Sequence, residues 1–413
     1  MINKINELRK DALIRGSFIL FMMLILYNIF NYVFQISMAR MLGPADYSIL
    51  AALMSTIYVF AIPNEAIQTV ISKYTSKFTA FNKKGKIKYL LFRSMNQGLL
   101  FSFFIFLILI PASWFLSNFL RIPFLLMLLT SLFIFYVFTF PITRGIMQGQ
   151  KKFMSLGLNL TLESLIKAVF AIFFVALGLK VYGAIFAVVV GWIISFILSF
   201  FVIKDVIKEK KEEEKFGRIY HTNIPVIIAI TSIVLMYSLD IILARRFFLP
   251  QNAGEFAFVS LIGKVIFFVS AAIGKALFPI SSEDFVRGKQ TSDLFKKSLL
   301  LVSLIAFLAL IVYLFFPQEI IYLISLGSDQ YLAASNILFI TGLSYSFLSI
   351  TNIIVLYKLS IDKINRRAYY LLAFPIFQVI LLSLFHSSLS EFAISLLISN
   401  SLMLLYSLYL IEK

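Results

Sequence analysis

Long runs of apolar residues, separated by short polar or charged segments, occupy most of the chain. A helix needs about 20 apolar residues to cross the hydrocarbon core of a bilayer, and twelve runs approach or reach that length. They cover residues 13–38, 47–71, 90–116, 123–147, 156–179, 182–203, 222–247, 255–279, 298–317, 332–357, 368–386 and 390–411. We therefore expect an all-α polytopic membrane protein with twelve transmembrane helices.

The composition agrees with a chain that lies mostly inside a bilayer. Of its 413 residues, 61% are hydrophobic and 14% are charged, whereas soluble domains carry about 25% charged residues. A water-soluble enzyme of this length could not bury so much apolar surface, and the runs are too continuous for the alternating strands of a β-barrel. The first run is longer than the roughly 7–15 apolar residues of a cleaved signal peptide, so we expect a retained helix.

The positive charges lie mainly on one side of the predicted membrane. The formal net charge is +17, with 37 lysines and arginines. In alternate connections, 29 of these cations fall in the set that begins with the N-terminus and 5 fall in the other set. Because cytoplasmic loops collect lysine and arginine, we place both termini in the cytoplasm and the chain in the cell membrane. The basic excess then reports orientation, and we expect no nucleic-acid partner.

One sequence pattern occurs twice. The stretch Ala39–Tyr47 (ARMLGPADY) follows the first apolar run, and 244–256 (ARRFFLPQNAGEF) follows the seventh. Six runs separate the copies, so both enter the membrane in the same direction, as in transporters whose halves are related by an axis along the membrane normal. We predict two six-helix bundles related by a parallel pseudo-two-fold repeat, over 1–203 and 219–413, with a cytoplasmic linker at 204–218. A cleft between such halves is typical of a transporter.

Polar side chains inside the apolar runs are the candidates for functional contacts, because a charge at a helix centre costs about 2.5–3.5 kcal/mol and usually faces a cavity or a partner. The cations of this kind, including one at the entrance of the first helix, are Arg15, Lys167, Lys264 and Lys275. The amides that fall on one face of the first and second helices are Asn28, Asn31, Gln35, Asn64 and Gln68. The carboxylates are Glu65, Glu163 and Asp240.

Spacing indicates which of these charges can neutralise one another. Glu163 and Lys167 are four residues apart, in the order that favours an ion pair within one helix. Asp240 and Lys264 fall at comparable depths in consecutive helices, so these two can pair across a short turn. Each of the three carboxylates is a candidate for such pairing or for coupling to H+ or Na+.

Each polar group also has a purely structural alternative. The amides of the first helix can hydrogen-bond between helices as part of helix packing. The polar stripe of the second helix can mark a structural kink in which Glu65 is neutral and hydrogen-bonded. Arg15 and Lys275 lie close enough to the predicted cytoplasmic ends of their helices to extend to the headgroups. Pro63 precedes the polar stripe of the second helix and is expected to kink it.

Residues for catalysis or for a tightly bound cofactor are not apparent. The chain has no cysteine, and its only histidines, His221 and His386, lie far apart in sequence. No metal-ligand cluster, nucleophile with a base, or glycine-rich phosphate loop is visible. We expect no catalytic residue, no metal and no cofactor other than a coupling ion.

Several segments resemble one family. Ala39–Tyr47 resembles the exit of the first helix in polysaccharide flippases of the multidrug/oligosaccharidyl-lipid/polysaccharide exporter superfamily. Residues 144–153 (RGIMQGQKKF) resemble the connection between helices four and five of the same family. Residues 239–256 and 261–279 resemble its seventh and eighth helices. Ser48 departs from the family, which usually has glycine there, whereas Gly254 is kept in the second copy.

This resemblance implies twelve helices in two bundles around a central cavity. It also implies a function, the movement of a lipid-linked oligosaccharide, typically on undecaprenyl diphosphate, from the inner to the outer leaflet for capsule, O-antigen or exopolysaccharide assembly. The four cations would then form a path for the diphosphate, and the amides would meet the sugars. Neutralising Lys264 is expected to abolish export without changing the protein level. Partners would be the lipid-linked oligosaccharide, the bilayer, and a glycan polymerase with its chain-length machinery.

Two other functions remain as alternatives. An ion-coupled multidrug or toxin antiporter of the same superfamily would use the carboxylates instead of the cations. A membrane polysaccharide polymerase or ligase would need a large external loop with catalytic residues. The longest external connections predicted here carry only Arg121, or Arg245 with Arg246, which disfavours an enzyme.

Overall fold

A computed structural model describes residues 2–214, 224–288, 290–361 and 365–412 of the chain. Every regular element in these ranges is a helix. Ten helices among the described residues are long and apolar enough to cross a membrane. The predicted all-α membrane class is therefore confirmed. Two predicted site residues, Arg15 and Lys275, lie outside the described side chains.

The helices gather into two compact units, which we describe one at a time. The first unit consists of residues 1–41 and 60–222, and the second consists of 42–59 and 223–413. The two predicted lobes divide the chain at the linker instead. That division of the duplicated sequence stays a prediction.

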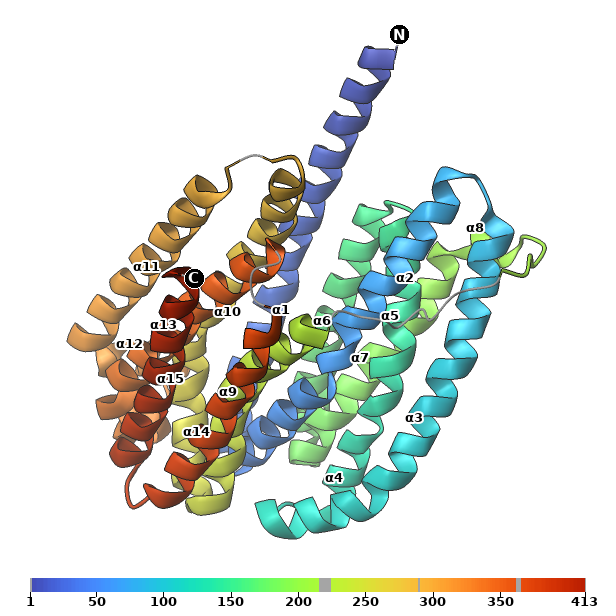
Figure 1. The fold of residues 1–413 in the computed structure, drawn as a ribbon. Coiled ribbons are helices and arrows are strands. Elements are labelled where there is room, and N and C mark those ends of the chain that lie inside the picture. Colours follow the sequence, from blue (N-terminus) through green and yellow to red (C-terminus); the bar gives the residue numbers. More distant parts are fainter. Residues whose placement is uncertain (1, 215–223, 289, 362–364, 413) are drawn as a thin grey trace. The chain divides into compact units, whose positions relative to one another are not determined.

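In the first unit, α2 (Ile62–Ala80), α3 (Lys84–Leu120) and α5 (Phe133–Gly149) lie side by side (Figure 1). A second closely packed pair is formed by α6 (Phe153–Phe174) and α7 (Lys180–Val202), which a π-helical turn at Val175–Leu179 connects. The other elements are the first part of α1 (Ile2–Phe60), α4 (Phe124–Ser131) and α8 (Lys204–Ile207).

In the second unit, α13 (Leu338–Ser360) occupies the centre. It contacts α9 (Ile224–Phe247), α10 (Pro250–Val286), α11 (Ser292–Phe315) and α15 (Leu389–Glu412). The helix α14 (Ala373–Leu384) packs against α9 and α15. The short α12 (Pro317–Ile324) and two 3-10 helices, Asp329–Ile337 and Asn365–Leu372, connect the longer helices. Of the most apolar window in 329–360, 72% of the residues are buried, so α13 is a core helix.

The two longest helical stretches are broken by glycine. α1 contains 59 residues, which would measure about 88 Å if straight, against a hydrocarbon core of about 30 Å. It is interrupted at Gly43, where φ is +71°, a conformation that only glycine adopts easily. The stretch Phe153–Val202 is interrupted in the same way at Gly178, where φ is +88°. The break predicted near Pro63 is also present, because α1 ends at Phe60 and Pro63 lies in the first turn of α2.

Several helices extend beyond the apolar runs. The connection between the predicted runs 47–71 and 90–116 is helical except for a turn at 81–83, because α2 continues to Ala80 and α3 begins at Lys84. Backbone hydrogen bonds hold a helix together in water as well as in lipid. Hydropathy therefore marks the part of a helix that faces the bilayer, and it misses the charged ends.

The start of the predicted linker is attached to the first unit. Lys152 Nζ donates to Asp205 Oδ1 at 2.6 Å, and Lys84 Nζ lies 3.6 Å from Asp205 Oδ2. Further along, the Lys88 ammonium donates to the Glu209 carbonyl at 2.8 Å, and Lys86 pairs with Glu214. The acidic side chains of the linker therefore meet part of the basic segment at the start of α3. Residues 215–218 of the predicted linker lie outside the described ranges.

The repeated pattern has a structural role in the second unit. Gly254 lies so close to Pro44 that a Cβ at Gly254 would overlap the Pro44 carbonyl. Beside this contact, Arg245 Nη1 donates to Ser48 Oγ at 2.9 Å. The serine that departs from the family pattern thus accepts a hydrogen bond from a buried arginine, and the glycine kept in the other copy permits backbone contact.

Replacing Gly254 by alanine is expected to lower the stability of the protein. The new methyl group meets backbone, which cannot rotate away as a flexible side chain would, and overpacking of this kind costs about 1–3 kcal/mol. Thermal unfolding of the full chain in detergent measures the effect. Asn252→Ala, at an exposed position on the same helix, is the control and should leave the midpoint nearly unchanged. An equal midpoint for Gly254→Ala and the unmodified protein would contradict the contact.

Replacing Asp205 by asparagine is expected to release the linker from the first unit. Partial burial acts to raise the pKa of Asp205, but the hydrogen bond and charge of Lys152, with the charge of Lys84, outweigh it and lower the pKa. The attachment should be complete above the unfolded pKa of about 3.9 and be lost as the pH falls through the lower folded pKa. Amide hydrogen exchange over 204–209 should accelerate in Asp205→Asn. The exposed neighbour variant Glu213→Gln serves as the control, and equal exchange in both variants would rule out the attachment.

Candidate functional site

A buried arginine organises the polar interior of the first unit. Arg144 lies on α5 with 4% of its surface exposed. Its Nε donates to Asn159 Oδ1 at 3.0 Å, and its Nη1 donates to the Tyr136 hydroxyl at 3.2 Å. The guanidinium lies 3.8 Å from the centroid of the Phe140 ring, and its Nη2 pairs with Glu163 of α6. Partners from two helices therefore hold this charge in a single place.

Lys167 has different partners from the one that its spacing predicts. Its Nζ donates to Asn31 Oδ1 on α1 and lies 4.6 Å from the centroid of the Phe34 ring. Among the described side chains, no carboxylate forms an ion pair with it within 4.0 Å. The expected pair with Glu163 is not formed because Arg144 binds that carboxylate. Arg144 is almost fully buried, whereas Lys167 is half-buried. Burial without a counter-charge is therefore more costly for Arg144 than for Lys167.

Small residues on α6 bring α1 close enough for the Lys167 contact. A Cβ at Gly157 would lie 2.6 Å from Met23 Cβ, and the Thr161 hydroxyl donates to the Met23 carbonyl at 3.1 Å. Gly157 and Thr161 are one turn apart, so they form a face against which α1 packs. Asn31 is oriented by its own Nδ2, which donates to the Tyr27 carbonyl at 2.8 Å. Its oxygen is left for Lys167.

A second charge cluster lies in the second unit. Lys264 Nζ of α10 lies 3.0 Å from Asp240 Oδ2 of α9. The same carboxylate accepts a hydrogen bond from Ser260 Oγ at 2.9 Å and another from the Tyr345 hydroxyl of α13. Asp240 is fully buried and Lys264 is 4% exposed. The structure thus brings Asp240 and Lys264 together, and it neutralises both within one network.

Glycine contacts between α10 and α13 position this second cluster. A Cβ at Gly263 would lie 2.9 Å from Tyr345 Cδ2 and 3.4 Å from the Gly342 nitrogen. At Gly342 a Cβ would lie 2.6 Å from the Tyr313 ring, whose hydroxyl donates to the Ile262 carbonyl at 3.0 Å. Close helix approach of this kind needs small residues, and it brings the Tyr345 hydroxyl within reach of Asp240.

The ion pairs and hydrogen bonds described for the two clusters do not include the remaining predicted site residues on α1 and α2. Gln68 Nε2 donates to Gln148 Oε1 at 2.9 Å, which links α2 to α5. Asn64 and Gln35 are half-buried, whereas Asn28 and Glu65 are exposed. Gln68 therefore contributes a hydrogen bond between α2 and α5.

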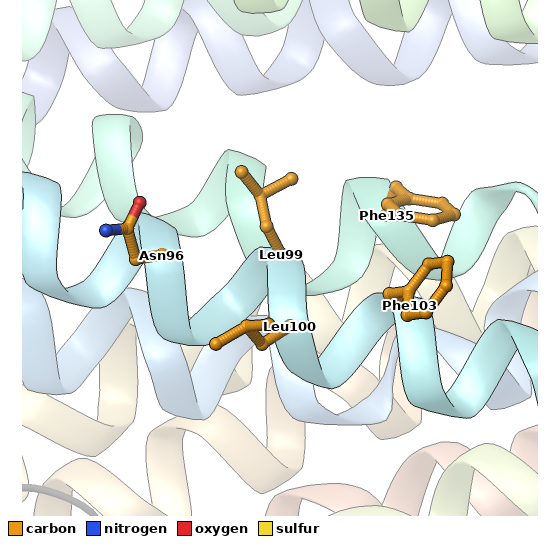
Figure 2. Close-up of a pocket in the computed structure, with 5 residues that line it drawn as sticks. All are labelled: Asn96, Leu99, Leu100, Phe103 and Phe135. Atoms are coloured by element: carbon orange, nitrogen blue, oxygen red, sulfur yellow. The ribbon is translucent and has the colours of Figure 1, made fainter.

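A groove of about 520 Å³ lies along α3, and α5 contributes one wall. Figure 2 shows its lining residues, which are Asn96, Leu99, Leu100, Phe103 and Phe135. Only 11% of the most apolar window of α3 is buried, so most of this helix is available to lipid. Because its single polar lining residue is an uncharged amide, this groove does not supply the chemistry for an anion.

Sequence reasoning missed two residues of these clusters. The family resemblance places Arg144 in the connection between the fourth and fifth helices, but α5 continues to Gly149 and carries Arg144 inside the first unit. Two features of the sequence could have indicated its role: Glu163 in the next helix and Tyr136 two turns before Arg144. The sequence does not distinguish Tyr345, because a tyrosine in an apolar run has no distinctive pattern until a neighbouring helix places a carboxylate beside it.

The described fold is similar to the folds of several solved membrane transporters. It is similar to an inward-facing multidrug resistance MATE family transporter of the MOP superfamily, at 14% identity and a TM-score of 0.71, with 93% of each chain covered. It is also similar to the lipid II flippase MurJ in an inward closed conformation, at 18% identity and a TM-score of 0.69, over 97% of this chain and 88% of that one. A MOP superfamily transporter from Pyrococcus furiosus gives 15% identity and a TM-score of 0.55, over 98% of this chain and 95% of that one. No curated protein sequence matched the chain.

The sequence itself identifies the family. Residues 13–285, more than half of the chain, match the family described as polysaccharide biosynthesis protein. The chain belongs to this family, and its fold is of the MOP transporter type. The resemblance noted in the sequence is confirmed.

The ion pair with Asp240 changes the expectation that neutralising Lys264 leaves the protein level unchanged. Replacing Lys264 alone is expected to destabilise the protein, because it leaves Asp240 buried without a counter-charge. Breaking a buried pair from one side costs about 3–5 kcal/mol. The double variant Lys264→Met with Asp240→Asn removes both charges and should recover most of the loss. Thermal unfolding in detergent and the yield of full-length protein measure this, with the exposed Lys204→Met as control. If the double variant were no more stable than Lys264→Met alone, the ion pair would not be the source of the loss.

Proposed function

We propose that this protein is a flippase that moves a lipid-linked oligosaccharide from the inner to the outer leaflet of the cell membrane by alternating access. The carrier would be of the undecaprenyl diphosphate type, and the product would enter surface polysaccharide assembly. Family membership supports the polysaccharide part of this proposal. The similarity to transporters, among them a lipid II flippase, supports the transport part.

The topology in this proposal has twelve crossings. Ten helices are candidates, and two of these stretches, of 59 and 50 residues, are long enough to supply two crossings each. The breaks at Gly43 and Gly178 are where each long stretch would turn. The asymmetry of the lysines and arginines would place both termini in the cytoplasm. The two halves would have equivalent topologies, as the repeated pattern suggests.

One observation carries the choice of an anionic substrate. Lys167 is an ammonium inside a membrane helix, and its described partners are an uncharged amide and an aromatic ring. A diphosphate that enters a region of low dielectric must keep charge partners, and an ammonium with unused donors can provide one. Lys264 has its charge neutralised by Asp240, so we assign Lys167 the contact with the anion. Amides such as Asn28 and Asn31 would meet sugars.

The multidrug antiporter is the second candidate, because MATE transporters share the fold. A transporter of cationic drugs would use a carboxylate for its substrate or for a coupling H+ or Na+. Glu163 and Asp240 are both paired with cations, and Glu65 is exposed on α2. The carboxylates inside the two clusters are thus already occupied, which favours the flippase. We propose no catalytic residue, metal or ATP site in the described part of the chain.

Replacing Lys167 by glutamine is expected to reduce export of the surface glycan at least about tenfold. A hydrogen bond to a charged group contributes roughly 1.5–3 kcal/mol, and 1.4 kcal/mol corresponds to a factor of about ten. Export is measured in a deletion strain that carries the variant, as the ratio of lipid-linked glycan at the inner leaflet to finished glycan outside. Lys208→Gln, at an exposed position in the linker, is the control for loss of one charge.

The deletion strain itself separates the candidate functions. A flippase mutant should accumulate lipid-linked glycan at the inner leaflet and keep its normal resistance to cationic drugs. Accumulation of drug with normal surface glycan would instead establish the antiporter. Glycan that reaches the outer leaflet but stays unpolymerised or unattached would point to the polymerase or ligase.

A further inference from the structure

The polar interior of the first unit contains an exchange of partners that its sequence spacing does not predict. Glu163 and Lys167 are one turn apart on α6, in the order that favours an ion pair within the helix. Instead, Glu163 pairs with Arg144 of α5, and Lys167 donates to Asn31 of α1. Each charge on α6 therefore reaches to a different neighbouring helix.

The contacts around Arg144 fix its guanidinium beside the Glu163 carboxylate. Its other two donor nitrogens are committed to Asn159 and Tyr136, and the Phe140 ring covers the guanidinium. Asn159 is itself anchored, because its Nδ2 donates to the Ser195 carbonyl at 2.8 Å. An arginine that is fixed on all sides and nearly inaccessible cannot follow Glu163 toward Lys167. Since it also cannot remain without a counter-charge, Glu163 stays with it.

The backbone behind these side chains is also constrained. A Cβ at Gly191 of α7 would lie 3.0 Å from the Glu163 carbonyl oxygen and 3.2 Å from Lys167 Cβ. The helix α7 therefore packs directly against the turn of α6 that carries both residues. Their side chains start from fixed positions, so the choice of partner depends on the side chains alone.

Lys167 is left with an ammonium that no carboxylate among the described side chains contacts within 4.0 Å. The Asn31 oxygen and the face of the Phe34 ring stabilise an ammonium without cancelling its charge. An ammonium has three donors, and one of them is used by Asn31. Lys264 shows the opposite arrangement, because Asp240 neutralises it within the same kind of helical unit.

We propose that Arg144 is a positioning residue, which holds Glu163 away from Lys167 and so keeps the Lys167 ammonium available for the diphosphate of the carrier. This inference rests on the proposed function and names the residue that maintains its anion site. Arg144 itself does not touch the substrate. Its removal would let Glu163 turn along α6 and neutralise Lys167.

The test measures binding of farnesyl diphosphate, a short isoprenyl diphosphate, to the full chain in detergent. Arg144→Gln is expected to weaken binding at least tenfold, because Glu163 then pairs with Lys167. Adding Glu163→Gln should restore the affinity to within threefold of the unmodified protein. The triple variant that also carries Lys167→Gln should lose binding again, which a merely structural role of the Arg144–Glu163 pair would not produce. Arg144→Lys, which keeps a cation for Glu163, should retain most of the affinity.

A second pair of variants tests the same idea with Arg144 intact, and it decides the matter if Arg144→Gln does not fold. Asn31→Asp gives Lys167 a carboxylate partner directly, and it should weaken binding as Arg144→Gln does. Asn96→Asp makes the same chemical change at an exposed position on α3 (Figure 2), and it should leave binding unchanged. Unchanged affinity in Asn31→Asp would overturn the proposal.

The outcomes distinguish this inference from the function on which it rests. If Lys167→Gln alone binds the diphosphate normally, the proposed anion site is wrong. If Lys167→Gln loses binding but folded Arg144→Gln keeps it, or if Glu163→Gln fails to restore it, only the role of Arg144 is wrong.

Discussion

The compensation of charge inside an apolar medium is the constraint on which this structure depends. Lipid offers no water to a buried ion, so every intramembrane charge must find its partner within the protein. Arg144 with Glu163, and Lys264 with Asp240, satisfy this requirement through ion pairs that also connect two helices. These pairs hold each unit together because separating the helices would leave a charge without a partner. The hydroxyls of Tyr136 and Tyr345 complete the two networks.

Close helix packing makes these networks possible. Lipid tails compete with apolar side chains for apolar surface, so the hydrophobic effect does not drive helices together inside a membrane. Small residues at the contact let two helix backbones approach closely, and short polar groups can then meet. Gly157 on α6 and Gly263 on α10 remove side-chain bulk where a neighbouring helix passes. The donors and acceptors then come within hydrogen-bonding distance. The positions of small residues and of charged residues are therefore parts of one arrangement.

Both units pair buried charges, but the two clusters differ in whether the lysine is part of the ion pair. In the second unit the network is closed, because the lysine and the carboxylate neutralise each other. In the first unit the arginine takes the carboxylate and the lysine keeps its charge. A protein that must admit a negatively charged headgroup into an apolar layer needs such an uncompensated cation, and a protein that must only stay folded does not. This difference is what links the geometry to the proposed transport of a diphosphate carrier.

The sequence by itself determined the class of the protein and most of the charged residues of the two clusters, because hydropathy and the cost of burying a charge are local properties. The apolar runs predicted the membrane helices, and the list of intramembrane charges included Glu163, Lys167, Asp240 and Lys264. Tertiary structure decided which charges pair. An ion pair within a helix is worth about 0.2–0.5 kcal/mol, whereas a buried charge left alone costs several. The weaker local preference of Glu163 for Lys167 therefore gave way to Arg144, a residue whose depth only the packing of α5 against α6 established.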